Sequence, residues 1–181
     1  NAADEISLYY GSASLQKSGG ALGGLVNLST TADWTQKPSV EVNLSAGSYS
    51  TYSNSANLSF GNSKIRSVTR IYHNISANDF EFVNSDIIDG SIQKQQNADY
   101  LQYGFLQDVH FRTGKKSVAS IKSWYQKMER GIPFLTTNES GFSNNISRQN
   151  DENLIMSAEY SSFNSGHRLD ISSGFNRQKL G

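Results

Sequence analysis

Four carboxylates fall close together in one polar stretch of the chain and could bind a cation. Asp79, Glu81, Asp86 and Asp89 follow Asn78, and oxygen-rich loops of this kind can hold Ca²⁺. Their spacing lacks the EF-hand pattern, and charged residues in a loop are ordinarily solvated. We therefore predict no metal site, and a calcium site at these carboxylates is kept as the alternative.

The other residues that could do chemistry do not form a catalytic set. His73, His110 and His167 are scattered along the chain, and no pair of them has the spacing of metal ligands. Asp108 and His110 would share one face of a strand, but no serine is placed to complete a nucleophilic triad. There is no cysteine, which excludes a disulfide framework and a thiolate-bound metal. We expect neither an enzyme nor a cofactor.

Aromatic side chains in polar stretches are the candidate ligand-binding residues. Such residues often mark a binding surface when they are exposed, but they can also pack loops against one another. Both interpretations are kept for the four phenylalanines concerned, which are Phe80, Phe82, Phe134 and Phe142.

The elements that would position these residues are β-strands, because apolar side chains recur at every second position. The clearest strand is 100–112, where only Gln107 interrupts the alternation. In 65–75 apolar residues fall on both parities, so its two faces stay unassigned. The pattern predicts about seven strands of roughly nine to eleven residues, the length of a tilted transmembrane strand. The alternating sections from which they are inferred are 40–46, 56–60, 65–75, 100–112, 117–126, 154–161 and 169–176.

Short and long connections alternate between these strands. The short ones, 62–64, 113–116 and 164–167, contain turn-forming residues. The long ones, 78–99 and 128–153, are polar and are expected to be loops without regular structure. Short turns on one side and long loops on the other are typical of an outer-membrane barrel, and compact soluble domains rarely carry two such loops.

The polar residues on one face of these strands favour a transmembrane β-barrel over a soluble sandwich. Burying such groups unpaired costs roughly 2–7 kcal/mol each, whereas a wet or plugged lumen avoids that cost. Seven strands would leave an open edge, so we predict an antiparallel all-β fold that is part of a larger barrel. Aromatic residues near strand ends are candidates for the interfacial girdles, namely Tyr49, Tyr72, Tyr100, Phe111, Tyr125 and Tyr160.

Four glycines close to the N-terminus precede a short apolar run. Gly19, Gly20, Gly23 and Gly24 lead into 25–28, and glycine lets two backbones approach closely. The glycines would either form a mobile element or allow steric packing of neighbouring strands. Together with the strand-like stretch 6–15, this segment resembles the closing part of the plug domain of TonB-dependent outer-membrane receptors, in a style closest to those of Bacteroidota.

The resemblance implies three parts. Residues 1–32 would be the C-terminal part of a plug domain, 33–39 the linker and 40–181 the first strands of the barrel, which has about 22 strands in this family. Two features depart from the family pattern. Tyr10 replaces a usual basic residue, and the turn at 16–18 has an unusual sequence.

A receptor of this family would bind a scarce ligand outside the cell and import it into the periplasm. The resemblance implies outer-membrane lipid, the TonB complex and a small-molecule, oligosaccharide or peptide ligand as partners, with a surface lipoprotein as a further one. Equal numbers of basic and acidic residues, 16 each, give no case for nucleic acid. The alternatives are a small passive channel or structural barrel, and a surface-displayed β-rich adhesin.

Overall fold

The computed structural model describes residues 5–10, 24–29, 33–35, 37–84, 90, 92–133 and 147–181. The chain divides into two compact units, Asn1–Asp33 and Trp34–Gly181, each of which is described by itself. In the first unit, β1 (Glu5–Tyr10) and β2 (Gly24–Ser29) form an antiparallel pair in which Tyr10 lies opposite Gly24. No helix among the described residues is long and apolar enough to cross a bilayer.

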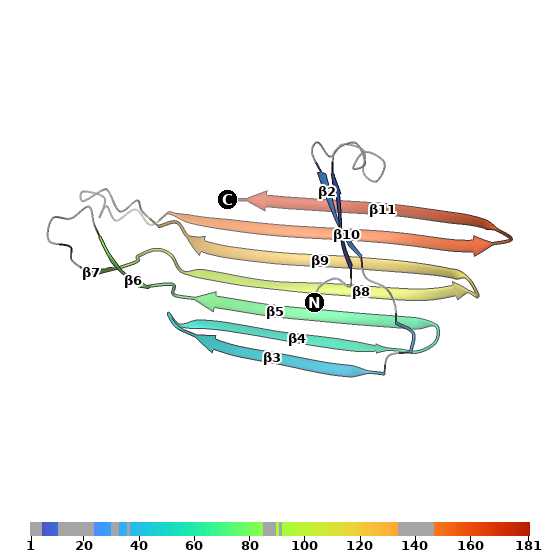
Figure 1. The fold of residues 1–181 in the computed structure, drawn as a ribbon, viewed down its shortest axis with the longest axis horizontal. Helices are drawn as coiled ribbons and strands as arrows, with labels where there is room; N and C mark the ends of the chain where they lie inside the picture. Colours follow the sequence, from blue (N-terminus) through green and yellow to red (C-terminus); the bar gives the residue numbers. More distant parts are fainter. Residues whose placement is uncertain are drawn as a thin grey trace. The chain divides into compact units, whose positions relative to one another are not determined.

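The second unit is built on one antiparallel sheet of seven strands in the order β11-β10-β9-β8-β5-β4-β3 (Figure 1). Strands that are adjacent in the sheet also follow one another along the chain, apart from β6 (Glu81–Val83) and β7 (Ile92–Lys94). These two strands come between β5 and β8 in the sequence and form a separate hairpin. The predicted antiparallel all-β fold is confirmed. The sheet is not closed, since β3 and β11 are its edges. Its strands are β3 (Ser39–Gly47), β4 (Thr51–Gly61), β5 (Ile65–Ser76), β8 (Tyr100–Gly114), β9 (Ser117–Gly131), β10 (Arg148–Asn164) and β11 (His167–Leu180).

Several strands are longer than the alternation predicted, and this shortens the loops. β10 has 17 residues because it begins at Arg148, and β9 continues to Gly131. Much of 128–153 is therefore strand, and β6 and β7 occupy part of 78–99. The expectation of two long loops without structure was wrong in these segments. Where these strands extend beyond their apolar section, both faces carry polar residues, so the alternation of apolar and polar residues that predicts a strand is lost.

The register places apolar and polar side chains on opposite faces of the sheet, here called the apolar face and the polar face. Directly paired residues share a face, so each face can be followed across all seven strands. One row of the apolar face runs through Val42, Ala56, Ile71, Phe105, Tyr125, Leu154 and Arg177. The adjacent row of the polar face runs through Asn43, Ser55, Tyr72, Gly104, Gln126, Asn153 and Gln178.

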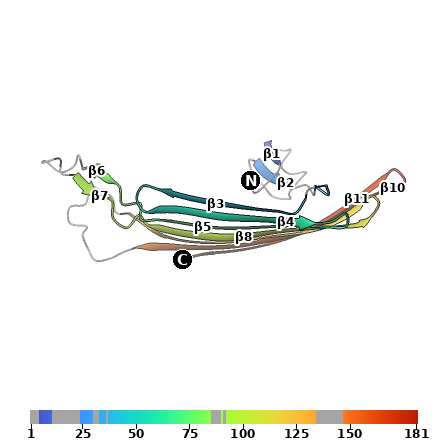
Figure 2. The same cartoon turned by 90° about the horizontal axis from the view of Figure 1, so that it is seen from below.

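The sheet has no apolar core of its own. Figure 2 shows its strands in one layer, and Ala98 is the single apolar residue that is buried among the described parts of the chain. Large side chains of the apolar face are correspondingly exposed, with Val42 at 59%, Ile71 at 47% and Ile171 at 56%. The free energy from burying apolar area, about 25 cal/mol per Å², is therefore not gained within this sheet.

The pairing also assigns the faces of β5, which its sequence alone left open. Ile65, Ile71 and Ile75 lie on the apolar face, whereas Arg66 and Arg70 lie on the polar face. Two bulky residues of β5, Val68 and Tyr72, share the polar face with these arginines and obscure the alternation. Of the girdle candidates, Tyr72 and Tyr100 therefore lie on the polar face, whereas Phe111, Tyr125 and Tyr160 lie on the apolar face.

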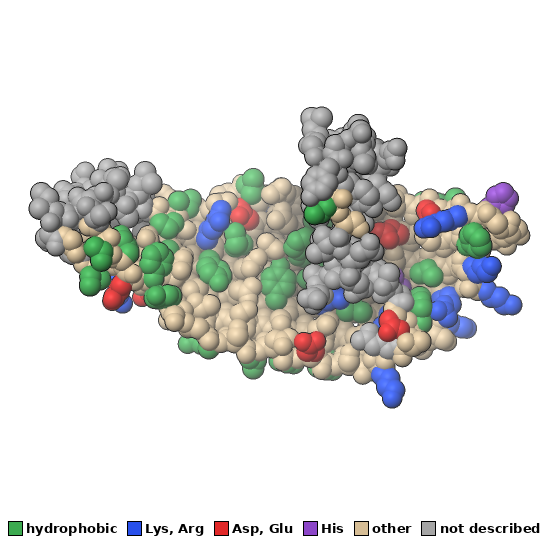
Figure 3. Space-filling view, in the orientation of Figure 1, with side chains coloured by type: hydrophobic (Ala, Val, Ile, Leu, Met, Phe, Trp, Pro, Cys, Tyr) green, Lys and Arg blue, Asp and Glu red, His purple; other side chains and the backbone are tan. Residues whose placement is uncertain are grey.

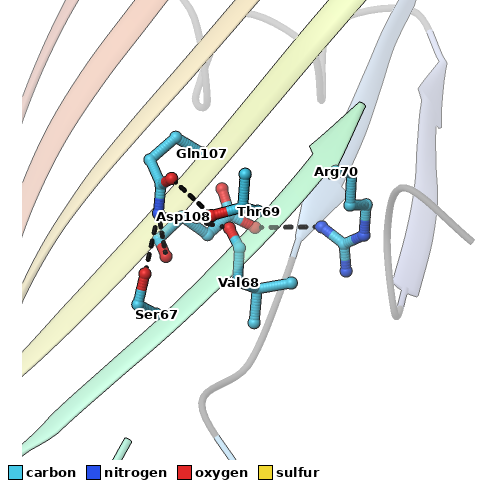
Figure 4. Close-up of polar contacts among 6 residues, drawn as sticks. All are labelled: Ser67, Val68, Thr69, Arg70, Gln107 and Asp108. Carbon is cyan, nitrogen blue, oxygen red and sulfur yellow. Dashed lines mark hydrogen bonds and ion pairs between the residues drawn. The ribbon is translucent and has the colours of Figure 1, made fainter. Parts of the chain in front are cut away.

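Gln107 interrupts the apolar face because it belongs to a small polar cluster there. Thr69 Oγ1 donates a hydrogen bond of 2.7 Å to Gln107 Oε1, and Gln107 Nε2 donates one of 2.9 Å to Ser67 Oγ. Figure 4 shows these contacts between β5 and β8, together with the ion pair of Arg70 and Asp108 on the polar face. Since the amide finds partners inside the sheet, it needs no water.

The two ends of the sheet differ in how they connect strands. The turn end carries the short β4–β5, β8–β9 and β10–β11 connections, and the loop end carries the β3–β4, β5–β8 and β9–β10 connections (Figure 1). At the turn end, Asn62 Oδ1 accepts bonds from the backbone N–H groups of Lys64 and Ile65. Ser165 and Gly166 both have positive φ, as a type I′ hairpin turn requires.

Gly104 is required by close packing on the polar face. A Cβ at this position would overlap the ring of Tyr72, whose hydroxyl donates a 2.9 Å hydrogen bond to Gln126 Oε1. We predict that Gly104→Ala lowers the free energy of unfolding by roughly 1–3 kcal/mol, the usual cost of overpacking. Chemical denaturation followed by tryptophan fluorescence measures it.

Gly174→Ala is the matched control, because its Cβ would meet its nearest neighbour, Met156 O, at an ordinary 3.8 Å. The cost of Gly104→Ala should shrink in a Tyr72→Ala background, which removes the overlapping ring. An equal cost in both backgrounds would show that the tyrosine ring is not the cause.

Candidate ligand-binding site

A pocket lies at the loop end of the polar face. Its volume is about 520 Å³, within the range of small-molecule sites. The ends of β8, β9 and β10 supply its floor, and the connections beyond them supply its rim. The floor residues are Tyr100, Gln102, Met128, Arg130 and Gln149, and the rim residues are Asn78, Ala98, Gly131, Ile132 and Pro133.

The floor holds one cation in a hydrogen-bonded chain. Arg130 donates from Nη2 and Nε to Gln149 Oε1, at 2.8 and 3.3 Å. The Gln149 amide nitrogen in turn donates to Asp151, at 3.0 Å to Oδ1. Arg130 is oriented by this chain, and the amides of Gln102 and Gln149 supply both donors and acceptors. With the Tyr100 ring beside them, these groups suit a polar ligand that has an apolar face.

Asn97 ties the rim together. Its Nδ2 donates two bonds of 2.8 Å, one to Ile132 O and one to Ser147 O, the two ends of the β9–β10 connection. Ile132 N–H also donates to Ser147 O at 3.0 Å. Asn97 has φ of +52°, a conformation that asparagine tolerates better than most residues. A Cβ at Gly131 would come within 2.5 Å of Asn97 O, so glycine there allows the close approach.

An ion pair lies next to this junction. Arg148 donates from Nη2 and Nη1 to the two carboxylate oxygens of Asp99, at 2.8 and 3.2 Å. The hydrogen bond from Arg148 lowers the pKa of Asp99 below its ordinary value of 3.8. Gly131 N–H donates to Asp99 O at 2.8 Å, so the segment before β8 is joined to both β9 and β10.

The opposite side of the rim rests on the β3–β4 turn. Asn78 Nδ2 donates to Ala98 O at 3.3 Å, and Asn78 N–H donates to Ser76 Oγ at 3.1 Å. Ser76 Oγ lies 2.7 Å from Thr51 Oγ1 and donates to Tyr49 O. The pocket rim is therefore held by polar contacts from several strands that are distant in sequence.

The aromatic candidates that the structure describes pack against one another. The Phe80 ring lies 6.2 Å from the rings of both Tyr49 and Phe82, and neither phenylalanine lines the pocket. This arrangement agrees with the packing interpretation. Phe134 and Phe142 lie outside the described residues, and ligand contact by any of the four stays a prediction.

The carboxylate candidates are only partly described. Asp79 lies 3.7 Å from Lys94 Nζ in an exposed ion pair, and Glu81 begins β6. Within the described part of the chain, no three His, Cys, Asp or Glu side chains gather as a metal site would require. Asp86 and Asp89 lie outside it, as do Gly19, Gly20 and Gly23, whereas Gly24 is the first residue of β2.

Most of the pocket was missed at the level of sequence. Arg130 and Gln149 fell in a predicted loop, and Tyr100 was assigned to the girdle. One signal was present, since Gln126, Met128 and Arg130 continue the parity of the polar face beyond the predicted end of their strand. Asn97 gave no signal, because its partners are backbone carbonyls distant in sequence.

No protein-family model matches the chain, and no curated protein matches it.

The role of Asn97 can be tested with an isosteric change. In Asn97→Asp the donor is replaced by a carboxylate oxygen facing two carbonyls, while the tolerance of positive φ is retained. We predict that amide hydrogen exchange of Ile132 becomes roughly 10–100-fold faster, as two lost hydrogen bonds would allow. Mass spectrometry of the exchanged protein measures it.

Asn150→Asp is the control for the added charge. Asn150 is exposed at the loop end, and its hydrogen bonds with Gly181 are made by its backbone, which the substitution keeps. Unchanged exchange at Ile132 in Asn97→Asp would mean that the backbone alone holds the junction.

The ion pair predicts a particular pH dependence of local stability. Because the pKa of Asp99 is lowered in the folded protein, the stabilisation is complete above 3.8 and is lost as pH falls below that value. The pair is partly exposed, so it contributes about 1 kcal/mol or less. Near neutral pH Asp99 stays ionised, so small changes of pH there should not alter the protection from hydrogen exchange that the ion pair provides around Asp99. In Asp99→Asn the additional loss of protection below pH 3.8 should disappear.

Proposed function

We propose that the chain is part of a TonB-dependent outer-membrane receptor that imports a scarce ligand. One observation carries the proposal: the sheet is a single layer with an exposed apolar face and no core. Contiguous exposed apolar surface is rare on soluble monomers and marks a protein or membrane contact. A bilayer covers such a face and leaves the other one to a lumen.

The dimensions of the strands fit this assignment. β5 has 12 residues, so it is about 40 Å long and spans about 28 Å at a tilt of about 45°. That span is close to the hydrocarbon thickness of about 30 Å. The five inner strands of the sheet pair through backbone hydrogen bonds on both sides, as an apolar surrounding demands.

The polar face suits a lumen. Arg70 and Asp108 form an ion pair at 3.4 Å, and Lys122 and Glu159 form another at 3.6 Å. Buried Arg66 donates from Nη2 to Ser59 Oγ. Polar groups in such numbers would be costly in a dry core, but a lumen supplies water and further polar partners.

The open edges support a larger barrel. Among the described residues, β3 pairs only with β4 and β11 only with β10, so each has one side without a strand partner in that part of the chain. In a membrane these groups need partners, which further strands of a longer protein would supply. On this proposal residues 1–32 belong to the plug, 33–39 to the linker and 40–181 to the barrel wall.

The pocket fits the binding step of such a receptor. It lies on the polar face at the loop end, and in a receptor of this kind the longer loops face the cell surface. An oligosaccharide, a peptide or another polar small molecule would meet Tyr100, Arg130 and Gln149 there. The TonB complex would act through the plug, outer-membrane lipid would surround the apolar face, and a surface lipoprotein would be a further partner. No covalent chemistry or cofactor is invoked.

A passive channel or structural barrel and an adhesin are the two alternative functions, and each predicts a different property of the protein. A passive channel or structural barrel shares the membrane face but needs no plug, and a whole mature protein near the 20.0 kDa of this chain would favour it. An adhesin would be a folded monomer in buffer without detergent. That outcome would contradict both membrane functions.

Labels on adjacent residues of β8 test the membrane face. Phe105 lies on the apolar face and Leu106 on the polar face, and the chain has no native cysteine. A spin label at Phe105→Cys should be more accessible to oxygen, which concentrates in lipid, than to a water-soluble nickel complex. At Leu106→Cys the preference should be reversed.

Ile171→Cys and Ser172→Cys repeat the comparison on β11, where the two residues also face opposite sides. Electron paramagnetic resonance in phospholipid vesicles measures both pairs. Equal access of the nickel complex to all four labels would overturn the membrane assignment.

A further inference from the structure

The turn end of the sheet carries basic residues without acidic ones in its turns. Lys64 lies in the β4–β5 turn, Lys115 and Lys116 form the β8–β9 turn, and Arg168 follows the β10–β11 turn. All four are exposed, and Figure 3 shows Lys and Arg side chains gathered toward this end, at the right of the view. Only Arg168 among them forms an ion pair with a described residue, Asp170 at 2.7 Å.

The loop end is different, because most of its basic residues form ion pairs. Lys94 pairs with Asp79 at 3.7 Å, Lys127 with Glu129 at 2.7 Å and Lys179 with Glu152 at 3.9 Å. Arg148 pairs with Asp99. The formal net charge of the whole chain is zero, so the positive potential of the turn end arises from the distribution of charge and not from its sum.

Aromatic side chains adjoin these basic residues. Phe60, Phe111 and Tyr160 lie on the apolar face close to the turns. Lys116 Nζ lies 5.1 Å from the centre of the Phe163 ring, and the Arg112 guanidinium carbon lies 4.4 Å from that of Trp34. Aromatic rings beside basic groups, at the edge of an apolar band, are typical of a membrane–water interface.

We propose that the turn end binds the anionic phospholipid headgroups of the leaflet that it meets. The turns recur at every second strand, so their basic groups form a row with a spacing of about 10 Å along the sheet edge. A row parallel to the edge of an apolar face matches a plane of phosphates above hydrocarbon. A folded acidic protein or a nucleic acid would not require the adjoining apolar band. This inference rests on the membrane assignment proposed above.

Vesicle partitioning of the whole chain tests the proposal. The protein is added to phosphatidylcholine vesicles with and without about one-third phosphatidylglycerol, at low and high salt. Anionic lipid should increase partitioning at low salt. Lys64→Gln, Lys115→Gln and Lys116→Gln together should reduce that increase by roughly fivefold per lysine, on the order of 100-fold in all.

A triple variant at the loop end is the matched control. Lys94→Gln, Lys127→Gln and Lys179→Gln remove the same number of charges and should retain most of the increase. Inorganic phosphate at equal ionic strength should compete no better than chloride, which distinguishes a lipid surface from a free-phosphate site.

The outcomes separate the two proposals. Partitioning that is equal in both vesicle types would overturn headgroup binding and leave the membrane assignment intact. Failure to partition into either vesicle type would overturn the membrane assignment itself. An equal loss of the anionic increase in both triple variants would also overturn headgroup binding at the turn end, since net charge alone would then explain it.

Discussion

A shift of one residue in any pairing of the sheet would move the apolar side chains of every strand beyond that pairing to the polar face, because side chains alternate with a period of two. Register is thus the constraint on which the rest of the structure depends. It keeps Val42, Ile71 and Phe105 on one side across their three strands. It also sets Arg70 beside Asp108 and places Arg130 opposite Gln149, so the ion pairs and the pocket follow from the same pairing.

The sequence predicted the fold class and the approximate positions of the seven strands of the sheet, because period-two alternation is a local signal. It failed where two signals overlap. In β5, Val68 and Tyr72 are bulky residues on the polar face, and their role became visible only when Gly104 and Gln126 were placed beside Tyr72. Gln107 likewise looked like an error in the pattern until Thr69 and Ser67 supplied its partners.

The pocket was less predictable than the fold, for a physical reason. Its rim depends on side chains that bind backbone carbonyls. Every residue has a backbone carbonyl, so the sequence does not indicate which carbonyl a side chain will bind. Asn97 reaches Ile132 O and Ser147 O across 35 and 50 residues. The phenylalanine candidates were chosen for their chemistry alone, and the structure adds that Phe80 packs against Tyr49 and Phe82.

The two ends of the sheet solve different problems with the same residue types. At the loop end, most basic residues form ion pairs and asparagines bind carbonyls, so these polar groups hold the rim of the pocket together. At the turn end, tight hairpins satisfy their own backbone, as Asn62 does for Lys64 and Ile65, and the lysine side chains stay available for contacts outside the sheet. Because the turns of this end do not need the lysine charges for their own conformation, those charges can contact a surface outside the protein. That division explains how a chain of zero net charge presents one strongly basic edge.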